Sequence, residues 1–236
     1  MKETPKVLFL LCGRNGSKGV PNKNVRPVLG KPLMMYTVEG LKECGFYTHL
    51  VVSTDGDPIK SAVKGHVDLV IDRPSELATD TIGRWPTLKH ALESCEKQFD
   101  IRYDYVFDFL VTAPLRRVED LNTCFELIQQ DAVSNVITAT PSHRSPYFNM
   151  VEVDPETNAP VIVKAESGPF FRRQDAPETY DMNGSIYAWK RDVLLEGDNL
   201  FLKKTKLHIM PSYTSIDIDT EEDFEYLEFI LNKRNG

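Results

Sequence analysis

Residues 7–31 of this chain read VLFLLCGRNGSKGVPNKNVRPVLGK. The apolar run from Val7 to Leu11 is typical of a strand that is covered on both faces. It opens directly into a glycine-rich loop, whose backbone can turn tightly and approach a ligand closely. Five cations and no acid lie within residues 13–31, although the whole protein has a formal net charge of −7. The stretch therefore predicts a buried strand that leads into a loop for a polyphosphate anion.

This N-terminal loop, residues 13–31, matches neither of two common phosphate motifs. Its GRNGSKG run lacks the GxxxxGK[ST] spacing of nucleoside triphosphatases, and it lacks GxGxxG followed by an acid about 20 residues later. Backbone amides near Gly16, together with Arg14, Lys18 and Lys23, are nevertheless suited to hold nucleotide phosphates and to stabilise leaving pyrophosphate. The alternative interpretation is a solvated basic loop.

Composition restricts the class of protein. With 236 residues, 41% of them hydrophobic and 27% charged, the chain is expected to form a single main domain over residues 1–236. No apolar stretch approaches the roughly 20 residues that span a bilayer, so we expect no membrane association. The acidic balance without a basic helix argues against a nucleic-acid partner. Four scattered cysteines without CxxC spacing indicate reduced thiols, three of them inside helices or strands, and a cytoplasmic protein.

Short apolar runs alternate with helical patterns along most of the chain. This alternation is the signature of βαβ units and predicts an open α/β sandwich with a mainly parallel sheet. The strands after the first are expected at residues 49–53, 68–71, 105–111, 135–139, 185–189 and 207–210, and the helices at 32–44, 85–98, 118–129 and 221–231.

The alternation breaks at residues 141–182, where prolines separate short pieces. Two of these pieces, FNMVEVD and APVIVK, predict a hairpin with Asp154 to Asn158 as its turn. The insert is expected to leave the sheet and to form either a lid over the site or an arm that contacts a second subunit. Periodicity does not separate these two possibilities.

A second cluster of polar residues lies in SIDIDTEEDF, residues 215–224. On a strand, Asp217 and Asp219 would face one side, while the isoleucines between them would face the core. Magnesium that bridges triphosphate oxygens is usually held by one or two carboxylates and several waters, and this spacing offers that ligand set. The alternative is an exposed acidic strand edge before a helix that Thr220 caps.

Five segments, in order, resemble motifs of the acylneuraminate (CMP-sialic acid) cytidylyltransferases. The core of the first, RNGSKGVPNKN within residues 9–24, resembles the N-terminal signature of that family. The others are LATDT at 77–81, TAPLRRVEDL at 112–121, RRQDAPETYDMNGSIY at 172–187 and SIDIDTEEDF at 215–224. The similarity spans nearly the whole chain, and several ordered motifs are more specific than any one of them.

The resemblance implies a three-layer α/β nucleotidyltransferase with a mainly parallel, Rossmann-like sheet, whose Pro-rich insert is a dimerisation arm. Such an enzyme transfers CMP from CTP to the anomeric hydroxyl of an acidic nine-carbon sugar, with Mg²⁺ as cofactor, and acts as a homodimer. Matching positions assign the CTP phosphates and ribose to Arg14, Gly16, Ser17, Lys18, Lys23 and Asn24, the cytidine to Ala78, Thr79 and Asp80, and Mg²⁺ to Asp217 and Asp219. For the acceptor sugar they assign Arg173, whose guanidinium would face the sugar carboxylate, together with Gln174, Asn183 and Phe201.

Catalysis by in-line attack of the sugar hydroxyl on the α-phosphorus needs positioning and charge neutralisation rather than a covalent intermediate. Arg14, Lys18 and Lys23, together with the metal at Asp217 and Asp219, are the expected catalytic groups. The proton of the attacking hydroxyl would go to Asp217, Asp219 or a metal-bound hydroxide, and the sequence does not choose among them.

The chain departs from the family pattern where the acceptor is expected. Leu110 replaces a glutamine that the family associates with the acceptor sugar, and losing such an amide removes a hydrogen bond worth about 0.5–1.5 kcal/mol. A legionaminic or pseudaminic acid, another sugar and neutral drift all fit this change. Two other functions remain open, namely a nucleotidyltransferase for sugar 1-phosphates, compatible with Arg172, Arg173, Lys203 and Lys204, and a non-catalytic nucleotide-sugar-binding module.

Overall fold

The structure, a computed structural model, describes residues 3–16, 19–79, 81–165, 170 and 172–235. Seven of the described strands form the central sheet. They are β1 (Val7–Cys12), β4 (His49–Thr54), β5 (Leu69–Asp72), β6 (Tyr105–Phe109), β7 (Asn135–Pro141), β10 (Tyr180–Lys190) and β11 (Thr205–Ile209). Their order across the sheet is β11-β7-β10-β6-β1-β4-β5. Only β10 runs antiparallel to its neighbours among these strands, so the predicted mainly parallel sheet is confirmed.

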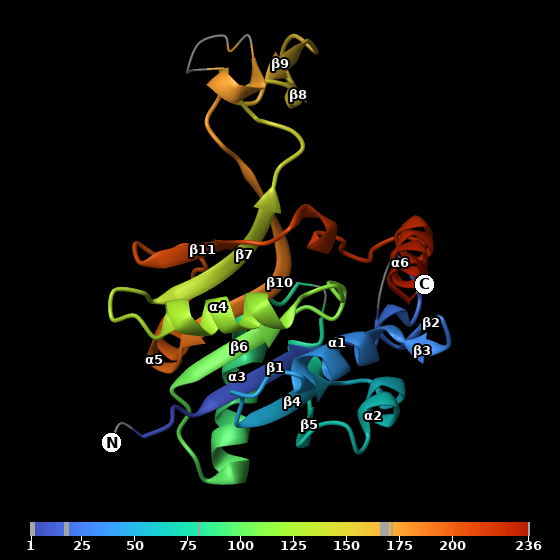
Figure 1. The fold of residues 1–236 in the computed structure, drawn as a ribbon, viewed down its shortest axis with the longest axis vertical. Helices are drawn as coiled ribbons and strands as arrows, with labels where there is room; N and C mark the ends of the chain where they lie inside the picture. Colours follow the sequence, from blue (N-terminus) through green and yellow to red (C-terminus); the bar gives the residue numbers. More distant parts are fainter. Residues whose placement is uncertain (1–2, 17–18, 80, 166–169, 171, 236) are drawn as a thin grey trace.

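Helices cover both faces of the sheet, as expected for a three-layer α/β sandwich (Figure 1). The core of one face includes residues from α1 (Leu33–Lys42), α2 (Asp57–Val63), α4 (Val118–Ile128) and α6 (Glu221–Asn235). The core of the other face includes residues from α3 (Arg84–Phe99) and α5 (Arg191–Glu196). The side chains of β1 alternate between the two cores, which explains why its sequence is apolar without interruption.

The chain leaves the sheet between Pro141 at the end of β7 and Tyr180 at the start of β10, which still pair with each other. β7 and β10 continue past the sheet and lead to a hairpin of β8 (Val151–Val153) and β9 (Pro160–Ile162), which stands away from the other elements (Figure 1). Asp154 Oδ1 accepts the amides of Glu156 and Thr157 at 2.9 Å each, so the turn lies where it is predicted. We call residues 141–182 the arm.

Several apolar side chains of the arm are exposed to solvent. Val151 and Val153 are 58% and 61% exposed, and each lies directly opposite an apolar residue of β9.

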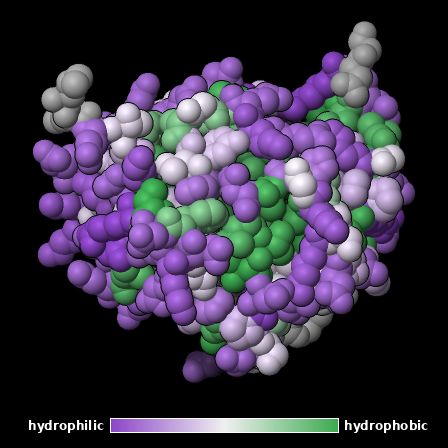
Figure 2. Space-filling view, turned by 90° about the horizontal axis from the view of Figure 1, so that it is seen from below, coloured by the Kyte–Doolittle hydropathy of each residue, from purple (hydrophilic) through white to green (hydrophobic). Residues whose placement is uncertain are grey.

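The opposite end of the molecule is mainly hydrophilic around one central hydrophobic patch (Figure 2). Among the described residues, no helix combines the length and the apolar character needed to cross a membrane.

The structure differs from the sequence prediction in a few elements. Helices α2 and α5 and the small hairpin of β2 (Pro27–Val28) and β3 (Lys31–Pro32) were not predicted. The expectation of a strand at Asp217 and Asp219 is wrong, since residues 215–219 form no ladder with a neighbouring strand. Their alternation of exposed aspartates and buried isoleucines has another cause, because Ile216 and Ile218 insert into the core beside α6.

An aromatic cluster fills the centre of one core. Phe9 of β1 is completely buried, and its ring lies between 4.9 and 5.4 Å from the ring centroids of Phe46, Tyr47, Phe107 and Phe109. These residues come from β1, β6 and the loop after α1, so the cluster fixes β1, the strand that carries the N-terminal loop.

We predict that Phe9→Ala lowers the free energy of unfolding by about 3–5 kcal/mol, because it removes a buried ring from a packed aromatic cluster. Urea denaturation followed by far-UV circular dichroism measures this loss. Phe229→Ala is the matched control, since Phe229 is 62% exposed on α6, and it should change the value by less than about 0.5 kcal/mol. Equal effects of the two substitutions would contradict this description of the core.

Candidate functional site

The N-terminal loop and residues 215–219, here called the carboxylate segment, are in direct contact. Lys23 Nζ lies 2.7 Å from Asp219 Oδ1. At Gly19 the two backbones touch, because a Cβ atom placed there would lie 2.4 Å from the carbonyl oxygen of Asp219. The structure therefore joins two predicted functional regions that are almost 200 residues apart in the sequence.

Next to this contact, Arg26 holds the start of α6. Its guanidinium forms an ion pair with Glu221 and lies 4.5 Å from the ring centroid of Phe224. Within the first turn of the helix, Asp223 accepts the amides of Asp219 and Thr220, and the amide of Asp223 donates to Thr220 Oγ1 at 3.3 Å. The predicted cap by Thr220 is confirmed, and the carboxylate segment is fixed at its carboxyl end.

Backbone contacts shape the beginning of the N-terminal loop. Gly13 N donates to Ser53 O at 3.1 Å, and Asn15 N donates to Asp55 Oδ1 at 2.9 Å, so the loop follows the end of β4. Asn24 is 8% exposed, and its amide nitrogen donates to Arg14 O at 3.0 Å. In this structure Asn24 therefore holds the loop backbone, while the nucleotide contact assigned to it stays a prediction.

The carboxylate segment offers two oxygen ligands. Desolvation within the site raises the pKa of Asp217, and the charge of Asp219 acts in the same direction, whereas a hydrogen bond from Thr112 and the charge of Lys23 oppose them. In the described part of the chain, no three or more His, Cys, Asp or Glu side chains form a metal-binding group. A pair of carboxylates suits Mg²⁺ that takes its remaining ligands from water and substrate phosphates, and it does not suit a metal enclosed by protein ligands alone.

Beside the N-terminal loop lies a cavity of about 220 Å³ at the carboxyl end of β1. We call it the arginine cavity, because Arg14, Arg73 and Arg84 all line it. Arg73 Nη2 donates to Ser53 O at 2.6 Å, and Arg84 pairs with Asp108 of β6. Cys12 also lines the cavity, and burial, followed by the charge of Asp108, raises the pKa of its thiol to about 11, so it stays protonated at neutral pH.

Sequence analysis missed Arg73, Arg84 and Asp108. One signal was available, since Asp108 interrupts the apolar run YVFDFLV of a central strand, where an unpaired carboxylate would be costly. Of the residues expected near the cytidine, Thr79 lines the arginine cavity, and Ala78 is the residue directly before Thr79 in the sequence. Ser17, Lys18 and Asp80 lie outside the described residues, and so does the side chain of Arg173.

The residues predicted to bind the acceptor lie in three places. Gln174 lines a cavity of about 540 Å³ at the base of the arm, together with Ser142, Tyr180 and Ile209. Phe201 is 63% exposed in the connection before β11. Leu110 packs tightly against Gly184, where the backbone has a φ of +59° and a Cβ atom would lie 2.1 Å from Leu110 Cδ1.

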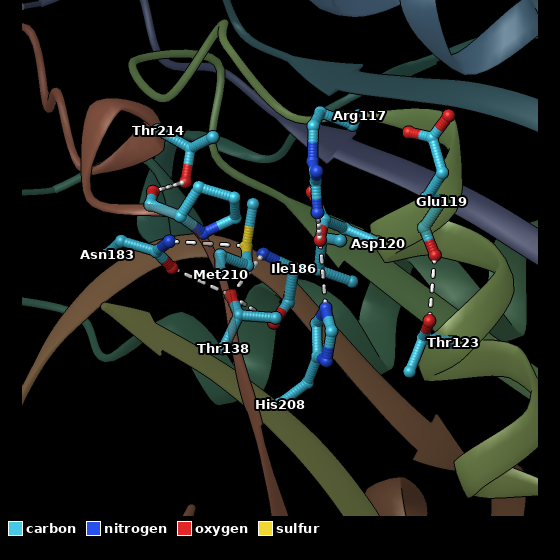
Figure 3. A network of polar contacts seen from close by, with 11 residues as sticks. Arg117, Glu119, Asp120, Thr123, Thr138, Asn183, Ile186, His208, Met210 and Thr214 are labelled. Carbon is cyan, nitrogen blue, oxygen red and sulfur yellow. Dashed lines mark hydrogen bonds and ion pairs between the residues drawn. The ribbon is translucent and has the colours of Figure 1, made fainter. Parts of the chain in front are cut away.

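Asn183 is used inside the protein rather than at an open surface. It is 4% exposed, its Oδ1 accepts from Thr138 Oγ1 at 2.7 Å, and its amide nitrogen lies 3.3 Å from the sulfur of Met210 (Figure 3). These contacts join β7 and β10 to the segment after β11. An acceptor contact through Asn183 stays a prediction.

A second polar network lies close by and connects α4 to the edge of the sheet (Figure 3). Asp120 is completely buried and accepts two hydrogen bonds from Arg117, at 2.8 and 2.7 Å, and lies 2.9 Å from His208 Nε2. Burial opposes ionisation, but the hydrogen bonds from Arg117 and His208 outweigh it and lower the pKa of Asp120 to about 2. The network fixes α4 against β11.

Comparison with known proteins identifies the family. A family model described as "Cytidylyltransferase" matches residues 8–234. The chain belongs to the cytidylyltransferase family. The nucleotidyltransferase class predicted from the sequence is thereby confirmed.

Two relatives align with this chain over almost their whole length. The chain is 38% identical over 231 residues to a protein named CMP-N,N′-diacetyllegionaminic acid synthase of Campylobacter jejuni, an alignment that covers 98% of this chain and 97% of that protein. It is 39% identical over 231 residues, with the same coverage, to the post-translational flagellin modification protein B of Campylobacter coli. Among solved structures, CMP:2-keto-3-deoxy-manno-octonic acid synthetase complexed with CTP superposes with a TM-score of 0.72 at 17% identity, covering 97% of this chain and 99% of that one. This last likeness confirms the fold.

We predict that Gly19→Ala lowers the catalytic efficiency of this cytidylyltransferase at least tenfold, because its Cβ would push the N-terminal loop away from the backbone of Asp219. Steady-state kinetics with varied CTP measure the loss. Gly40→Ala is the control, since Gly40 lies in α1 and the added Cβ would have no atom within 4 Å outside its chain neighbours and the backbone of its own helix. Normal kinetics in the Gly19 variant would show that contact between the loop and the carboxylate segment is not needed.

Proposed function

We propose that this cytidylyltransferase transfers CMP from CTP to the anomeric hydroxyl of a nonulosonic acid and releases pyrophosphate. The observation that carries the proposal is the contact of Lys23 with Asp219. Lys23, a cation that suits a triphosphate, lies directly beside Asp219, a carboxylate that suits a divalent metal. A reaction that displaces pyrophosphate needs both kinds of group at the same place.

In the proposed reaction, Arg14 and Lys23 bind phosphate oxygens while Asp217 and Asp219 hold Mg²⁺. When bound, Mg²⁺ supplies positive charge that neutralises the phosphate oxygens of the leaving group. Lys23 exchanges its ion pair with Asp219 for a phosphate oxygen. The Asp219 side chain is 70% exposed, which leaves its carboxylate open to a metal ion, while the Lys23 side chain is 14% exposed.

For the acceptor we propose a nonulosonic acid of the legionaminic type. The support is the relative named CMP-N,N′-diacetyllegionaminic acid synthase, which aligns over nearly the whole chain. Leu110 adds a second reason, because its apolar side chain has no hydrogen-bonding group for a polar substituent and favours contact with a methyl or deoxy carbon. Gln174 lies at the base of the arm, where a cavity of about 540 Å³ is large enough for such a sugar.

The proposal predicts that the protein with CTP and Mg²⁺ releases pyrophosphate on addition of N,N′-diacetyllegionaminic acid, and more slowly with N-acetylneuraminate. A coupled assay for inorganic pyrophosphate measures this with a panel that includes pseudaminic acid and a sugar 1-phosphate. Asp219→Asn should reduce the rate at least a hundredfold without a change in circular dichroism, because one of the two carboxylates for the metal is lost.

Preference for ATP, GTP or UTP would overturn the assignment of the nucleotide. Equal turnover of sugar 1-phosphates would favour the alternative acceptor class, and full activity of Asp219→Asn would remove the metal assignment. No pyrophosphate release with any acceptor, although CTP binds, would favour a non-catalytic binding module.

We also propose that the enzyme works as a homodimer in the cytoplasm and that the arm forms the dimer contact. A two-stranded hairpin is at best marginally stable alone, and β8 and β9 place Val151, Val153, Pro160 and Ile162 on one face. A second copy of the chain would cover this face. Arg173 and Gln174 lie in the arm, so the dimer contact would form next to the proposed acceptor cavity.

We predict that Val151→Asp combined with Val153→Asp converts the dimer into a monomer, since two buried charges would face the apolar contact. Size-exclusion chromatography with light scattering measures the mass. Phe229→Asp is the control, because it adds a charge at an equally exposed apolar side chain on α6 and should leave the dimer intact. A fully active monomer of the unmodified protein would contradict the role of the arm.

A further inference from the structure

The loop between β6 and α4 is closed by a guanidinium near its end. We call residues 110–116 the β6 loop. Arg116 Nη2 donates to the carbonyl oxygen of Leu110 at 2.7 Å, and the guanidinium carbon of Arg116 lies 5.3 Å from the ring centroid of Phe109. A longer bond, from Ala113 N to Leu110 O at 3.4 Å, forms a turn within the loop. Arg116 therefore holds the end of the β6 loop to its start.

The same guanidinium joins the β6 loop to β10. Arg116 Nε donates to the carbonyl oxygen of Ser185 at 3.3 Å. Ser185 lies in the stretch of β10 between Met182 and Tyr187, where the register with β7 shifts. A strand ladder is locally disrupted at such a shift, so a side chain that bonds the backbone there adds a fixed point. Arg116 thus fixes the β6 loop against the irregular part of β10.

The positive charge of Arg116 is not matched by a carboxylate of its own. The acid whose charge acts on Arg116 is Asp108, and Asp108 pairs with Arg84. Nη1 of Arg116 is buried, and it has no hydrogen-bond partner among the residues that the structure describes. Burial lowers the pKa of Arg116 to about 9, so the group is protonated at neutral pH but is held in the fold at a cost. A role in the site explains such a group better than a gain in stability does.

The middle of the β6 loop contacts the carboxylate segment. The hydroxyl of Thr112 donates to Asp217, and the carbonyl oxygen of Thr112 accepts from Ile218 N at 2.9 Å. Val111 and Ala113, on either side of Thr112, are buried. Thr112 is therefore held in place by its neighbours, and its hydroxyl orients the carboxylate of Asp217. Carboxylates that bind a metal are commonly oriented by hydrogen bonds of this kind.

We propose that Arg116 is a positioning residue for the transfer reaction. It closes the β6 loop against β10 and thereby holds Thr112 at Asp217, so that this carboxylate is oriented for the metal. The proposal rests on the proposed function, since it takes Asp217 to be a metal ligand. Arg116 acts through Thr112 and does not contact the metal.

The first test is Thr112→Val, which keeps the shape of the side chain and removes the hydroxyl. Mn²⁺, a paramagnetic substitute for Mg²⁺, is titrated into the protein with a smaller amount of CTP and no acceptor, and bound Mn²⁺ is measured by electron paramagnetic resonance. The dissociation constant of Mn²⁺ should rise by roughly tenfold to a hundredfold. Thr123→Val is the matched control, because it removes a hydroxyl that donates to Glu119 O at 2.9 Å within α4, and it should leave Mn²⁺ binding unchanged.

The second test is Arg116→Lys, which keeps the positive charge and loses the planar fork that holds two carbonyl groups. It should keep the circular dichroism of the parent and weaken Mn²⁺ binding as Thr112→Val does. Arg116→Lys combined with Thr112→Val should bind Mn²⁺ no more weakly than the weaker single variant, because the two residues act in series. Arg191→Lys is the control, since it breaks another fork, with bonds of 2.7 Å to Glu96, beside the start of β6, and it should bind Mn²⁺ as the parent does.

Unchanged Mn²⁺ binding in either Thr112→Val or Arg116→Lys would overturn the inference and leave the proposed function intact. Additive losses in the double variant would also overturn it, since Arg116 would then act by a route other than Thr112. Loss of the parent's circular dichroism in Arg116→Lys would assign Arg116 to the fold and overturn the inference as well. If Asp217→Asn bound Mn²⁺ as tightly as the parent, the metal assignment of the proposed function would fail, and the inference would fail with it.

Discussion

The candidate site of this protein depends on one contact, in which the N-terminal loop lies against the carboxylate segment at Gly19, Lys23 and Asp219. Without it, the cations after β1 and the aspartates before α6 would be separate surface features. The surrounding packing maintains the contact from both sides. The aromatic cluster around Phe9 fixes β1, while Ile218 is completely buried in the core of the same face.

The contact is also suited to be exchanged. The partly exposed ion pair of Lys23 and Asp219 contributes little to stability. A triphosphate can therefore replace Asp219 as the partner of Lys23, and a divalent cation can replace Lys23 as the partner of Asp219. A strong buried pair lies nearby and differs in character. Arg84 and Asp108 form two short hydrogen bonds at a completely buried carboxylate, and there the geometry is fixed rather than exchangeable. The site thus combines an exchangeable ion pair at the N-terminal loop with a rigid ion pair at the arginine cavity.

Sequence patterns predicted most of the fold, because strands such as β1 and helices such as α3 have strong periodicity and clear ends. They failed at residues 215–219, where alternation of aspartate and isoleucine indicated a strand. Alternation reports which side chains are buried, and an irregular segment whose isoleucines enter the core produces the same pattern. They also missed the arginine cavity, since Arg84 and Asp108 are 24 positions apart and only the crossing of α3 over the sheet brings them together. Family resemblance supplied the residue roles at Lys23 and Asp219, and the structure supplied their contact.

We propose that Lys23 and Asp219 bind one metal–triphosphate complex between them. A crystal structure of the protein with CTP and Mg²⁺ tests it most directly, through the distances from Lys23 Nζ to Asp219 and to the nearest phosphate oxygen. We predict that Lys23 lies within hydrogen-bond distance of a phosphate oxygen and that the Asp219 carboxylate contacts the metal. A triphosphate bound elsewhere, with Lys23 and Asp219 still paired at 2.7 Å, would contradict it.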